Sequence, residues 1–255
     1  MEAPETLAVG NLLDLSGEHV LVTGASGNIG RGIAVRLAEA GATVVAHYHR
    51  NEAAADALIE RLGNGRTVCA DLADEASVDR MLDSTEVTMV VNNAAVQTVQ
   101  SLDELSFSDW RIMMAANLDS AFLVTRRIAA NWSVAGRGGA IVNIGSIEGL
   151  DPAAGHGHYA TSKAGLLMFS RAAALEFGPA GIRINCVSPG LIDRDGLTED
   201  WPEGVGRWLD RVPLGRVGTP NDVADAVLFL LSPAARWISG TNLVVDGGMS
   251  TQGKW

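Results

Sequence analysis

The sequence predicts an α/β protein in which a doubly wound sheet of seven parallel strands is flanked by helices within a single domain. Short runs of apolar and β-branched residues alternate with amphipathic helical stretches along the chain. These runs are almost continuously apolar, which is typical of parallel strands that helices cover on both faces. The chain has 255 residues, of which 47% are hydrophobic and 19% charged, so it can bury a large core.

The expected strands follow one another with helical or loop segments between them. They span residues 19–23, 43–47, 67–70, 88–92, 140–144, 183–187 and 242–245. The first helix is expected at residues 31–40, where it ends before a glycine. No linker divides the chain, so we expect one domain over residues 17–255, preceded by an N-terminal extension over residues 1–16.

One segment, residues 194–216, interrupts the alternation with glycines, prolines, charges and two tryptophans. We expect this segment to form a substrate-binding lid rather than a separate domain. Trp201 and Trp208 are seven residues apart and would share one face of a helix. They either close over a bulky or apolar substrate or pack the lid against the rest of the protein.

Charge and composition narrow the classes of partner. The formal net charge of −11 disfavours nucleic acid and anionic membrane surfaces. The chain has no apolar run of about 18 residues, and residues 1–16 lack the basic start of a signal peptide, so we expect a cytoplasmic protein. Cys69 and Cys186 lie in strand-like stretches, where buried packing is the expected role. No spacing of His or Cys residues indicates a metal site.

A glycine-rich turn follows the first expected strand. It reads Thr23-Gly24-Ala25-Ser26-Gly27-Asn28-Ile29-Gly30 and leads into the first expected helix. Glycines permit a tight turn and a close approach of the backbone, while the N–H groups at the start of a helix attract phosphate. The turn therefore predicts a site for the pyrophosphate of a dinucleotide.

A second pattern carries acid/base chemistry. Tyr159 and Lys163 lie four residues apart in Tyr-Ala-Thr-Ser-Lys, and Ser146 precedes the tyrosine by thirteen residues. On a helix, the tyrosine and the lysine share one face. An ammonium held near a phenol favours the phenolate, so it can lower the tyrosine's pKa from about 10 toward neutral pH. The five-residue pattern by itself also fits an ordinary exposed helical pair.

With these motifs in order, the sequence resembles the short-chain dehydrogenase/reductase family, in particular its ketoreductase-like members such as the 3-oxoacyl-ACP reductases. The family's cofactor motif, Thr-Gly-x-x-x-Gly-x-Gly, matches at Thr23, Gly24 and Gly30, and Asn28 replaces the middle glycine. Asparagine tolerates a left-handed backbone, so we expect the turn to survive. Further family motifs follow over residues 18–248: Asp71-Leu72, Asn92-Asn93-Ala94-Ala95, Asn117, Ser146, Tyr159 with Lys163, and Pro189-Gly190.

The resemblance implies a Rossmann-type fold and a role for each catalytic residue. Tyr159 would donate a proton to a substrate carbonyl oxygen as hydride arrives from nicotinamide, and would take it back in the oxidative direction. Ser146 would hydrogen-bond the same oxygen. Lys163 would hold the nicotinamide ribose and lower the pKa of Tyr159. Asn117, within a long helical stretch, would complete a proton relay through water.

The resemblance also implies the cofactor contacts. Asp71 would bind adenine, Asn92 would support the cofactor from the fourth strand, and Pro189-Gly190 would turn the chain beneath the nicotinamide. Asp71 could instead cap the following helix, and Asn92 could simply end its strand. The expected cofactor-binding residues are Gly24, Ser26, Asn28, Ile29, Gly30, Tyr48, His49, Arg50, Asp71, Leu72, Asn93, Ala94, Tyr159, Lys163, Pro189, Gly190 and Ile192.

The end of the second strand distinguishes NADP(H) from NAD(H). A carboxylate there binds the free ribose 2′-hydroxyl and repels a 2′-phosphate. This sequence has Tyr48 at the position where NAD-preferring relatives carry Asp, followed by His49 and Arg50. An arginine can bind a 2′-phosphate through two hydrogen bonds, so NADP(H) is favoured over NAD(H).

The sequence therefore predicts an NADP(H)-dependent oxidoreductase that interconverts a ketone and a secondary alcohol. Two alternatives remain: a reductase of an imine or an activated C=C bond with the same fold, and a non-catalytic dinucleotide sensor. Glu148, His156 and His158 lie close to the catalytic residues in sequence. All three could face the substrate. Alternatively, Glu148 makes a structural hydrogen bond, and the two histidines are solvated loop residues.

The resemblance further implies a homotetramer, or a homodimer, built on two-fold axes through long helices and the last strand. Residues 159–177 are rich in Ala, Leu and Met, and residues 242–248 resemble the family's terminal strand. We also expect the tail that ends at Trp255 to reach a neighbouring subunit. A stop codon at Met249 that left assembly and substrate affinity unchanged would contradict that expectation.

Overall fold

The structure is a computed structural model that describes residues 7–252. These residues form one sheet of seven strands in the order β3-β2-β1-β4-β5-β6-β7, and every neighbouring pair is parallel. The predicted doubly wound α/β fold is confirmed. The strands are β1 (His19–Val22), β2 (Thr43–Tyr48), β3 (Gly65–Cys69), β4 (Met89–Asn92), β5 (Gly139–Ile144), β6 (Ile182–Pro189) and β7 (Asn242–Val245).

The strand order reverses beside β1. The chain passes from β1 to β2 and β3 on one side, then returns to place β4 on the other side of β1. Val20 illustrates this, because its partners are Val44 on β2 and Met89 on β4. In open parallel sheets, ligands bind outside the carboxyl ends of the strands at such a reversal. The fold therefore places the candidate site beyond the ends of β1 and β4.

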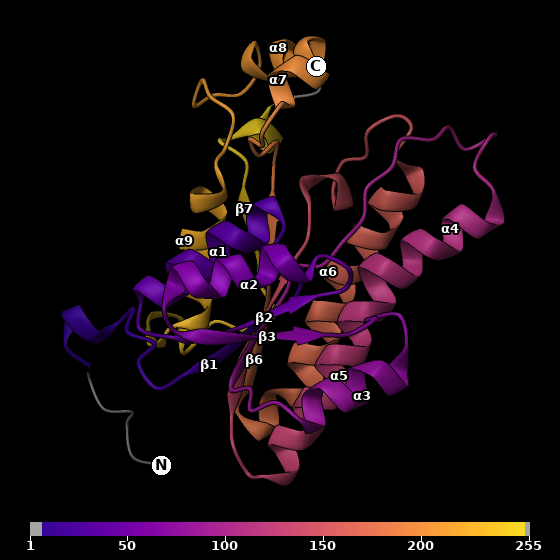
Figure 1. Cartoon of the computed structure of the whole chain (residues 1–255). Coiled ribbons are helices and arrows are strands. Elements are labelled where there is room, and N and C mark those ends of the chain that lie inside the picture. The colour runs from indigo at the N-terminus through magenta and orange to yellow at the C-terminus, as the bar shows by residue number, and fades with distance from the viewer. Residues whose placement is uncertain (1–6, 253–255) are drawn as a thin grey trace.

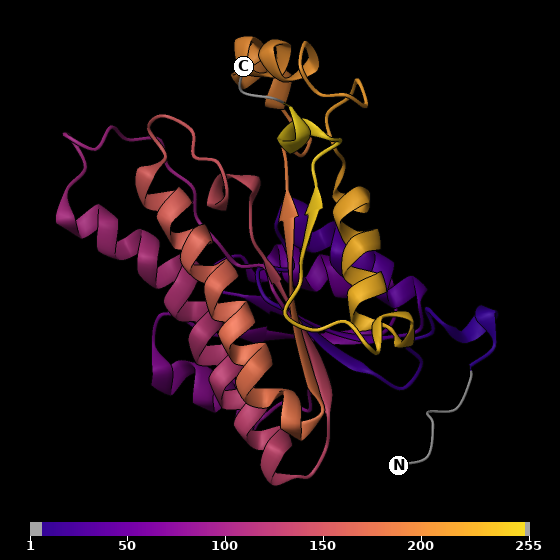
Figure 2. The same cartoon turned by 180° about the vertical axis from the view of Figure 1, so that it is seen from behind.

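Helices cover both faces of the sheet (Figures 1 and 2). One face packs against α1 (Asn28–Glu39), α2 (Glu52–Leu62) and α9 (Pro220–Leu231), whose apolar side chains share a core with β1 and β2. The other face packs against α3 (Glu75–Asp83), α5 (Ser120–Val134) and α6 (Gly157–Phe177). The strand side chains Val20, Leu21, Val22, Val44 and Val45 are fully buried between these layers, which explains why their sequences are continuously apolar.

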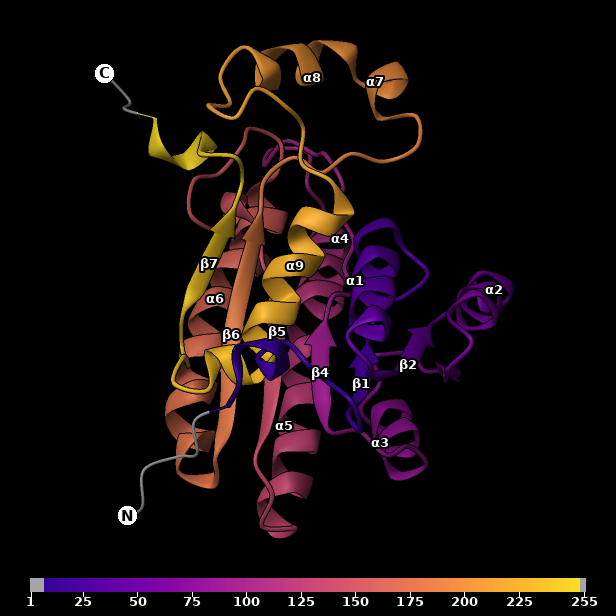
Figure 3. The same ribbon diagram turned by 90° about the vertical axis from the view of Figure 1, so that its left-hand side faces the viewer.

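The remaining helices, α4, α7 and α8, are short. Helix α4 (Phe107–Met114) continues through a π-helical turn (Ala115–Asp119) into α5. The lid holds α7 (Leu197–Asp200) and α8 (Pro202–Leu209), and Figure 3 shows both above the carboxyl ends of β6 and β7. Single 3₁₀ turns span Val9–Asn11, Ile147–Gly149, Gly178–Ala180, Pro233–Ala235 and Met249–Thr251.

The start of α1 corrects the sequence prediction. The helix begins at Asn28, three residues before the predicted position, because Gly27 already serves as its N-cap. Asn28 does not use the left-handed backbone that we expected of it: no non-glycine residue of the described chain has a positive φ. Within this turn only Gly24 does, with a φ of 62°. The replacement of the family's middle glycine by asparagine therefore carries no backbone strain here.

Cys69 is a second correction. It was expected to pack in the core, but it is exposed, whereas Cys186 is buried as expected. The reason is position: Cys69 ends β3, the edge strand, which pairs only with β2. At the other end of the chain, Leu15 is almost fully buried, so part of the 1–16 segment contributes to the core. Trp255 lies outside the described residues.

No helix within residues 7–252 combines the length and apolar character needed to span a membrane.

Candidate active site

The glycine-rich turn is fixed to the exit of β4 by two side chains. The Thr23 hydroxyl oxygen accepts hydrogen bonds from the backbone N–H groups of Asn93 and Ala94, each 2.9 Å long. The Asn93 side-chain amide donates in return to the carbonyl oxygens of Thr23 and Gly24, at 2.9 and 3.2 Å. A Cβ on Gly30 would lie 2.3 Å from the Gly24 oxygen, so only glycine fits there.

The start of α1 fits a phosphate group. Its N-cap, Gly27, offers no side-chain hydrogen bond, and the first amide of the helix with a backbone acceptor is that of Arg31, which donates to Gly27 at 2.8 Å. The amides before it point out of the helix end without a capping side chain, where a phosphate can accept them. Asn28, at the first helical position, donates at 2.6 Å to the carbonyl oxygen of Asp193 beyond β6. The predicted residues Ser26 and Ile29 lie in the same turn.

His47 holds this turn from the second strand. Its Nδ1 accepts a hydrogen bond from the Gly24 amide at 3.2 Å, and its Nε2 donates to the Ala70 carbonyl oxygen at 3.1 Å. These partners require the neutral tautomer with the proton on Nε2. Burial lowers the pKa of His47 to about 4, which keeps that tautomer at neutral pH. Sequence reasoning did not identify His47, although a histidine within an apolar strand was a visible signal.

The end of β2 carries the residues expected to select the cofactor. His49 and Arg50 are exposed, and the Arg50 guanidinium has no ion-pair partner among residues 7–252. The Tyr48 hydroxyl donates to the Glu52 carboxylate at 2.7 Å, and this bond raises the pKa of Tyr48. Glu52 is the first residue of α2 and was not identified from the sequence. Within the described part of the chain, Glu52 therefore bonds Tyr48 and not Arg50, so the Arg50 guanidinium can bind an anion.

The other adenosine-side residues divide into two groups. Asp71 is exposed beyond β3, where its carboxylate accepts a hydrogen bond from the Ala73 amide at 3.0 Å, and Leu72 beside it is buried. Asp74, not Asp71, caps α3. Asn92 is buried, and its side-chain amide donates to Thr125 at 3.0 Å and to Asn143 at 2.8 Å. The Asn92 side chain therefore joins β4 to β5 and α5 inside the protein.

Ser146, Tyr159 and Lys163 come together on one side of the sheet. Ser146 follows β5 and is buried; its hydroxyl oxygen accepts the Glu148 amide at 3.1 Å, so its proton remains available to another acceptor. Tyr159 and Lys163 occupy successive turns of α6, and the Lys163 Nζ lies 5.7 Å from the centre of the Tyr159 ring. Lys163 is buried and donates to the Ile144 carbonyl oxygen at 2.8 Å.

The pKa of Tyr159 differs from the expectation. We expected the lysine to lower it, but burial raises the pKa of Tyr159 to about 12, with the Ser146 hydroxyl acting in the opposite direction and the Glu148 carboxylate adding to the rise. Burial also lowers the pKa of Lys163 to about 8. Desolvation is the largest cause of both pKa shifts. Both groups hold their protons at neutral pH.

Asn117 lies in the π-helical turn between α4 and α5. Its side-chain amide donates to the Val96 carbonyl oxygen at 2.9 Å and to the Ser162 hydroxyl at 3.1 Å, and its oxygen accepts from the Val96 amide at 2.8 Å. The side chain thus ties the segment after β4 to α6. Single π-turns are frequent at functional sites because they shift the backbone carbonyl groups.

The exit of β6 passes close to the lid. A Cβ on Gly190 would lie 2.6 Å from the Trp208 ring and 2.8 Å from the Asp246 Cβ, so Gly190 has no room for a side chain. Pro189 ends β6, and Ile192 forms an isolated bridge with Gly218. Trp208 therefore packs the lid onto the sheet. Trp201 is half exposed and rests on Gly204 instead, so the two tryptophans do not act as one face.

Glu148, His156 and His158, the remaining candidates, have different partners in the structure. The Glu148 carboxylate pairs with His156 Nδ1 at 2.7 Å, and the His156 ring lies against that of Tyr159. His158 is fully buried, and its Nε2 lies 2.8 Å from the Thr98 hydroxyl, so it supports the segment after β4. Neither histidine is a solvated loop residue. Among residues 7–252, no cluster of three or more His, Cys, Asp or Glu side chains could hold a metal ion.

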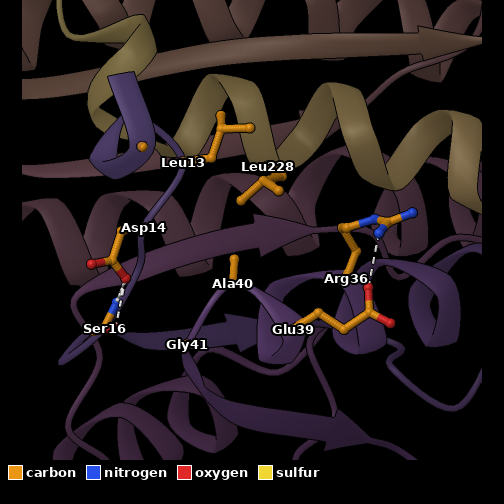
Figure 4. Close-up of a pocket in the computed structure, with 9 residues that line it drawn as sticks. Leu13, Asp14, Ser16, Arg36, Glu39, Ala40, Gly41 and Leu228 are labelled. Carbon is orange, nitrogen blue, oxygen red and sulfur yellow. Dashed lines mark hydrogen bonds and ion pairs between the residues drawn. The ribbon is translucent and has the colours of Figure 1, made fainter. Parts of the chain in front are cut away.

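A hollow of about 450 Å³ lies away from these residues (Figure 4). It is lined by Asp14, Ser16, Arg36, Glu39 and Gly41 among others, and Ser16 and Gly41 precede β1 and β2. The hollow is therefore at the amino ends of the strands, opposite the end at which Ser146 follows β5. Its charged groups bind one another: Asp14 accepts from Ser16, and Arg36 pairs with Glu39 at 2.8 Å.

The fold and the site together define the class of protein. A strand reversal with a glycine turn and an uncapped helix start is the geometry that binds a dinucleotide. Ser146, after β5, and Tyr159 and Lys163, on α6, lie together on one side of this sheet. This combination is that of an NAD(P)-dependent oxidoreductase of ketones and alcohols.

The chain belongs to the short-chain dehydrogenase/reductase family. The family model described as "Enoyl-(Acyl carrier protein) reductase" matches residues 24–250. L-xylulose reductase of Mesocricetus auratus is 37% identical over 239 residues, covering 92% of this chain and 98% of its own. The 3-oxoacyl-[acyl-carrier-protein] reductase FabG of Escherichia coli (strain K12) is 36% identical over 246 residues, covering 93% and 99%.

Solved structures of similar proteins have the same fold. A putative short-chain alcohol dehydrogenase from Sinorhizobium meliloti 1021 superposes with a TM-score of 0.89 at 32% identity, over 94% of this chain and 99% of its own. A gluconate 5-dehydrogenase from Burkholderia cenocepacia J2315, solved in complex with NADP and tartrate, also gives 0.89 at 29% identity, over 95% and 99%. The expected family and fold are thus confirmed.

Proposed function

We propose that the protein is an NADP(H)-dependent ketoreductase in which Tyr159 is the proton donor. The observation that carries the proposal is the state of the two hydroxyl groups beside Lys163. Ser146 accepts the Glu148 amide and lies within hydrogen-bonding reach of Tyr159, whose pKa of about 12 keeps it protonated. Both can donate to one carbonyl oxygen, as ketone reduction requires.

The proposed reaction assigns one task to each residue. The bound nicotinamide supplies hydride to the carbonyl carbon. Ser146 donates a hydrogen bond to the carbonyl oxygen, and Tyr159 transfers its proton to that oxygen, which leaves a phenolate. Lys163, charged below a pH of about 8, stabilises this phenolate through its Nζ, which lies 5.7 Å from the centre of the Tyr159 ring. In the oxidative direction the phenolate takes the proton back.

Asn117 acts on this site through position. Its side chain is already bonded to Val96 and Ser162, so a relay of protons through water would use the backbone carbonyl groups of the π-helical turn. In this proposal the Asn117 side chain fixes α6 relative to the π-helical turn. It does so through Ser162, the residue directly before Lys163. The Asn117 side chain therefore supports the position of Lys163, and the proposed water relay passes the backbone of the turn.

The cofactor proposal rests on Arg50. The gluconate 5-dehydrogenase and a putative 2-deoxy-D-gluconate 3-dehydrogenase from Agrobacterium tumefaciens were both solved with NADP. In this chain Arg50 is exposed just after β2, without an ion-pair partner among residues 7–252.

Arg50→Ala is expected to weaken NADPH binding at least tenfold and to leave NADH binding unchanged. Arg80→Ala, on the outer side of α3, is the matched control, and a stronger binding of NADH by the unaltered protein would overturn the proposal.

Absorbance at 340 nm tests the reaction. The protein is mixed with NADPH or NADH and with a panel of ketones, imines and conjugated C=C compounds. We expect NADPH consumption with ketones and a loss of about 1,000-fold in Tyr159→Phe, with cofactor binding retained. Consumption with C=C compounds alone would instead favour the activity named by the matching family model. Cofactor binding without any turnover would favour the dinucleotide sensor.

The proposed assembly is a homotetramer, or a homodimer. Large apolar side chains are exposed on α4, α5 and α6, where Ile112, Phe122, Met168 and Leu175 lie. At the β7 edge of the sheet, every residue of β7 is half-buried, and Trp237 before it is 98% exposed. Both surfaces are of the kind that subunit contacts cover.

A further inference from the structure

Glu148 and His156 form a polar pair directly beside the catalytic residues. Glu148 follows Ser146 by two residues in a 3₁₀ turn, and His156 precedes Tyr159 by three at the start of α6. The His156 Nδ1 and a Glu148 oxygen are 2.7 Å apart, and their side chains are only 16% and 19% exposed. The chain thus holds a partly buried polar pair beside Tyr159.

The pair has hydrogen-bonding atoms that other residues of the described chain leave largely unsatisfied. The second Glu148 oxygen has only a long contact of 3.4 Å from the exposed Gln97 side chain. The His156 Nε2 has no hydrogen-bond partner among residues 7–252. The rings of His156 and Tyr159 meet edge to face, with their centres 6.2 Å apart. One acceptor oxygen and one ring nitrogen therefore remain for a ligand that lies against Tyr159.

The chemistry of the pair selects the ligand. An alkyl or aryl group placed there would strip water from the carboxylate and the imidazole without replacing its hydrogen bonds, which costs binding energy. A hydroxyl group can donate to the Glu148 oxygen and accept from, or donate to, the imidazole. A carboxylate on the substrate would face the carboxylate of Glu148, and the repulsion between the two negative charges would weaken its binding.

We propose that Glu148 and His156 bind a hydroxyl group next to the reacting carbonyl, so that the substrates are neutral hydroxyketones of the sugar type. This inference deepens the proposed ketoreductase function and rests on it. It replaces the apolar substrate that the two lid tryptophans suggested, because Trp201 packs on Gly204 and Trp208 on Gly190. The pair acts on specificity, while Ser146 and Tyr159 act on the carbonyl oxygen.

Isosteric ketone pairs test the proposal. Hydroxyacetone and 2-butanone differ only by a hydroxyl in place of a methyl group, as do 1,3-dihydroxyacetone and 3-pentanone at two positions. A four- or five-carbon ketose extends the series. We expect kcat/KM to favour the hydroxylated member of each pair by about 100-fold, because a site built for a hydroxyl rejects its methyl analogue. Glu148→Gln, which keeps the shape of the side chain, is expected to reduce this preference to less than about tenfold, mainly through KM.

Controls separate specificity from stability. Glu60→Gln removes a carboxylate from the exposed side of α2, far from Tyr159, and should leave the preference unchanged. His156→Gln should weaken the preference like Glu148→Gln. Equal loss for both members of each pair in the Glu148 variant, or a preference of the unaltered protein for alkyl ketones, would overturn the proposal.

A binding measurement keeps the two proposals distinguishable. Saturation-transfer NMR with erythritol and 1,2-butanediol detects binding in the presence of NADP⁺ without any turnover. Binding of erythritol that Glu148→Gln abolishes supports the hydroxyl site even if the ketone panel shows no reduction, which would overturn only the ketoreductase proposal. Turnover of ketones without hydroxyl preference overturns only the hydroxyl site.

Discussion

At the scale of single residues, the site depends on side chains that bind the backbone rather than the ligand. His47 is the clearest example, because it is almost fully buried and joins the Gly24 amide to the Ala70 carbonyl oxygen. Thr23 and Asn93 hold the same turn from the other side. The turn that receives phosphate is thus fixed before the cofactor arrives, which lowers the entropy cost of binding.

His47 gives a prediction about cofactor affinity. His47→Leu removes the acceptor of the Gly24 amide, so the turn loses one hydrogen bond worth about 1 kcal/mol, and the Kd for NADPH is expected to rise five- to tenfold. His47→Asn places an amide oxygen close to where Nδ1 was and should bind NADPH within about twofold of the unaltered protein. Isothermal titration calorimetry measures both. An equal loss of affinity in the two variants would mean that the ring, and not its acceptor atom, supports the turn.

Lys163 gives a prediction about stability and pH. Its pKa falls from the ordinary value of 10.5 to about 8 in the folded protein. Between these values the unfolded chain binds more protons than the folded one, so the free energy of unfolding rises with pH. The cost of burying the charge is therefore full below pH 8 and is relieved by pH 10.5. Relative to Lys163→Met, the unaltered protein should gain about 3 kcal/mol between pH 7 and 10.5 in urea unfolding. A constant difference between the two proteins would contradict the lowered pKa.

At the scale of secondary-structure elements, the lid helix α8 packs against the ring of Trp201, its own N-cap residue. The Trp201 ring lies where a Cβ of Gly204 would be, at 1.8 Å, whereas Gly206 in the same helix has open space around it. The two glycines therefore have opposite roles. Gly204 makes room for an aromatic ring, and Gly206 only loosens the helix.

These two glycines form a matched pair of variants. Gly206→Ala is expected to stabilise the protein by about 0.5–1 kcal/mol, since alanine is the better helix former and meets no other atom. Gly204→Ala is expected to destabilise it by about 1–3 kcal/mol, because the Trp201 ring must move. Thermal unfolding gives the sign of each change, and Trp fluorescence reports whether the ring has moved. Two stabilising substitutions would show that Trp201 does not rest on the helix.

The elements also show what the sequence could predict. The strand runs were recognisable because burial on both faces removes the alternation of polar and apolar residues, and β7 was predicted at its observed bounds. The start of α1 was missed because Gly27 caps the helix without a side-chain signal. The partners of Glu148 and His47 were not predictable, since their hydrogen bonds join segments separated by a whole turn or strand. The pKa of Tyr159 required its burial, which no motif encodes.

At the scale of the whole molecule, the two exposed apolar surfaces lie at different sides of the sheet. One covers α4, α5 and α6, and the other lies beside β7, the edge strand. Two independent two-fold contacts of this kind generate a tetramer with dihedral symmetry, whereas one alone gives a dimer. A free edge strand also invites pairing with another chain, and subunit contact is one way to cover it.

The assembly prediction follows from removing one surface at a time. Trp237→Glu places a charge on the most exposed large apolar side chain near β7 and is expected to convert the tetramer to a dimer. Leu175→Glu on α6, which is 79% exposed, should give a dimer through the other surface, and the double variant should be monomeric. Ala57→Glu adds the same charge to the exposed side of α2, outside both surfaces; it is the control and should remain a tetramer. Light scattering after size-exclusion chromatography measures each mass. A dimer in the unaltered protein that only one of the two substitutions dissolves would assign the assembly to that surface alone.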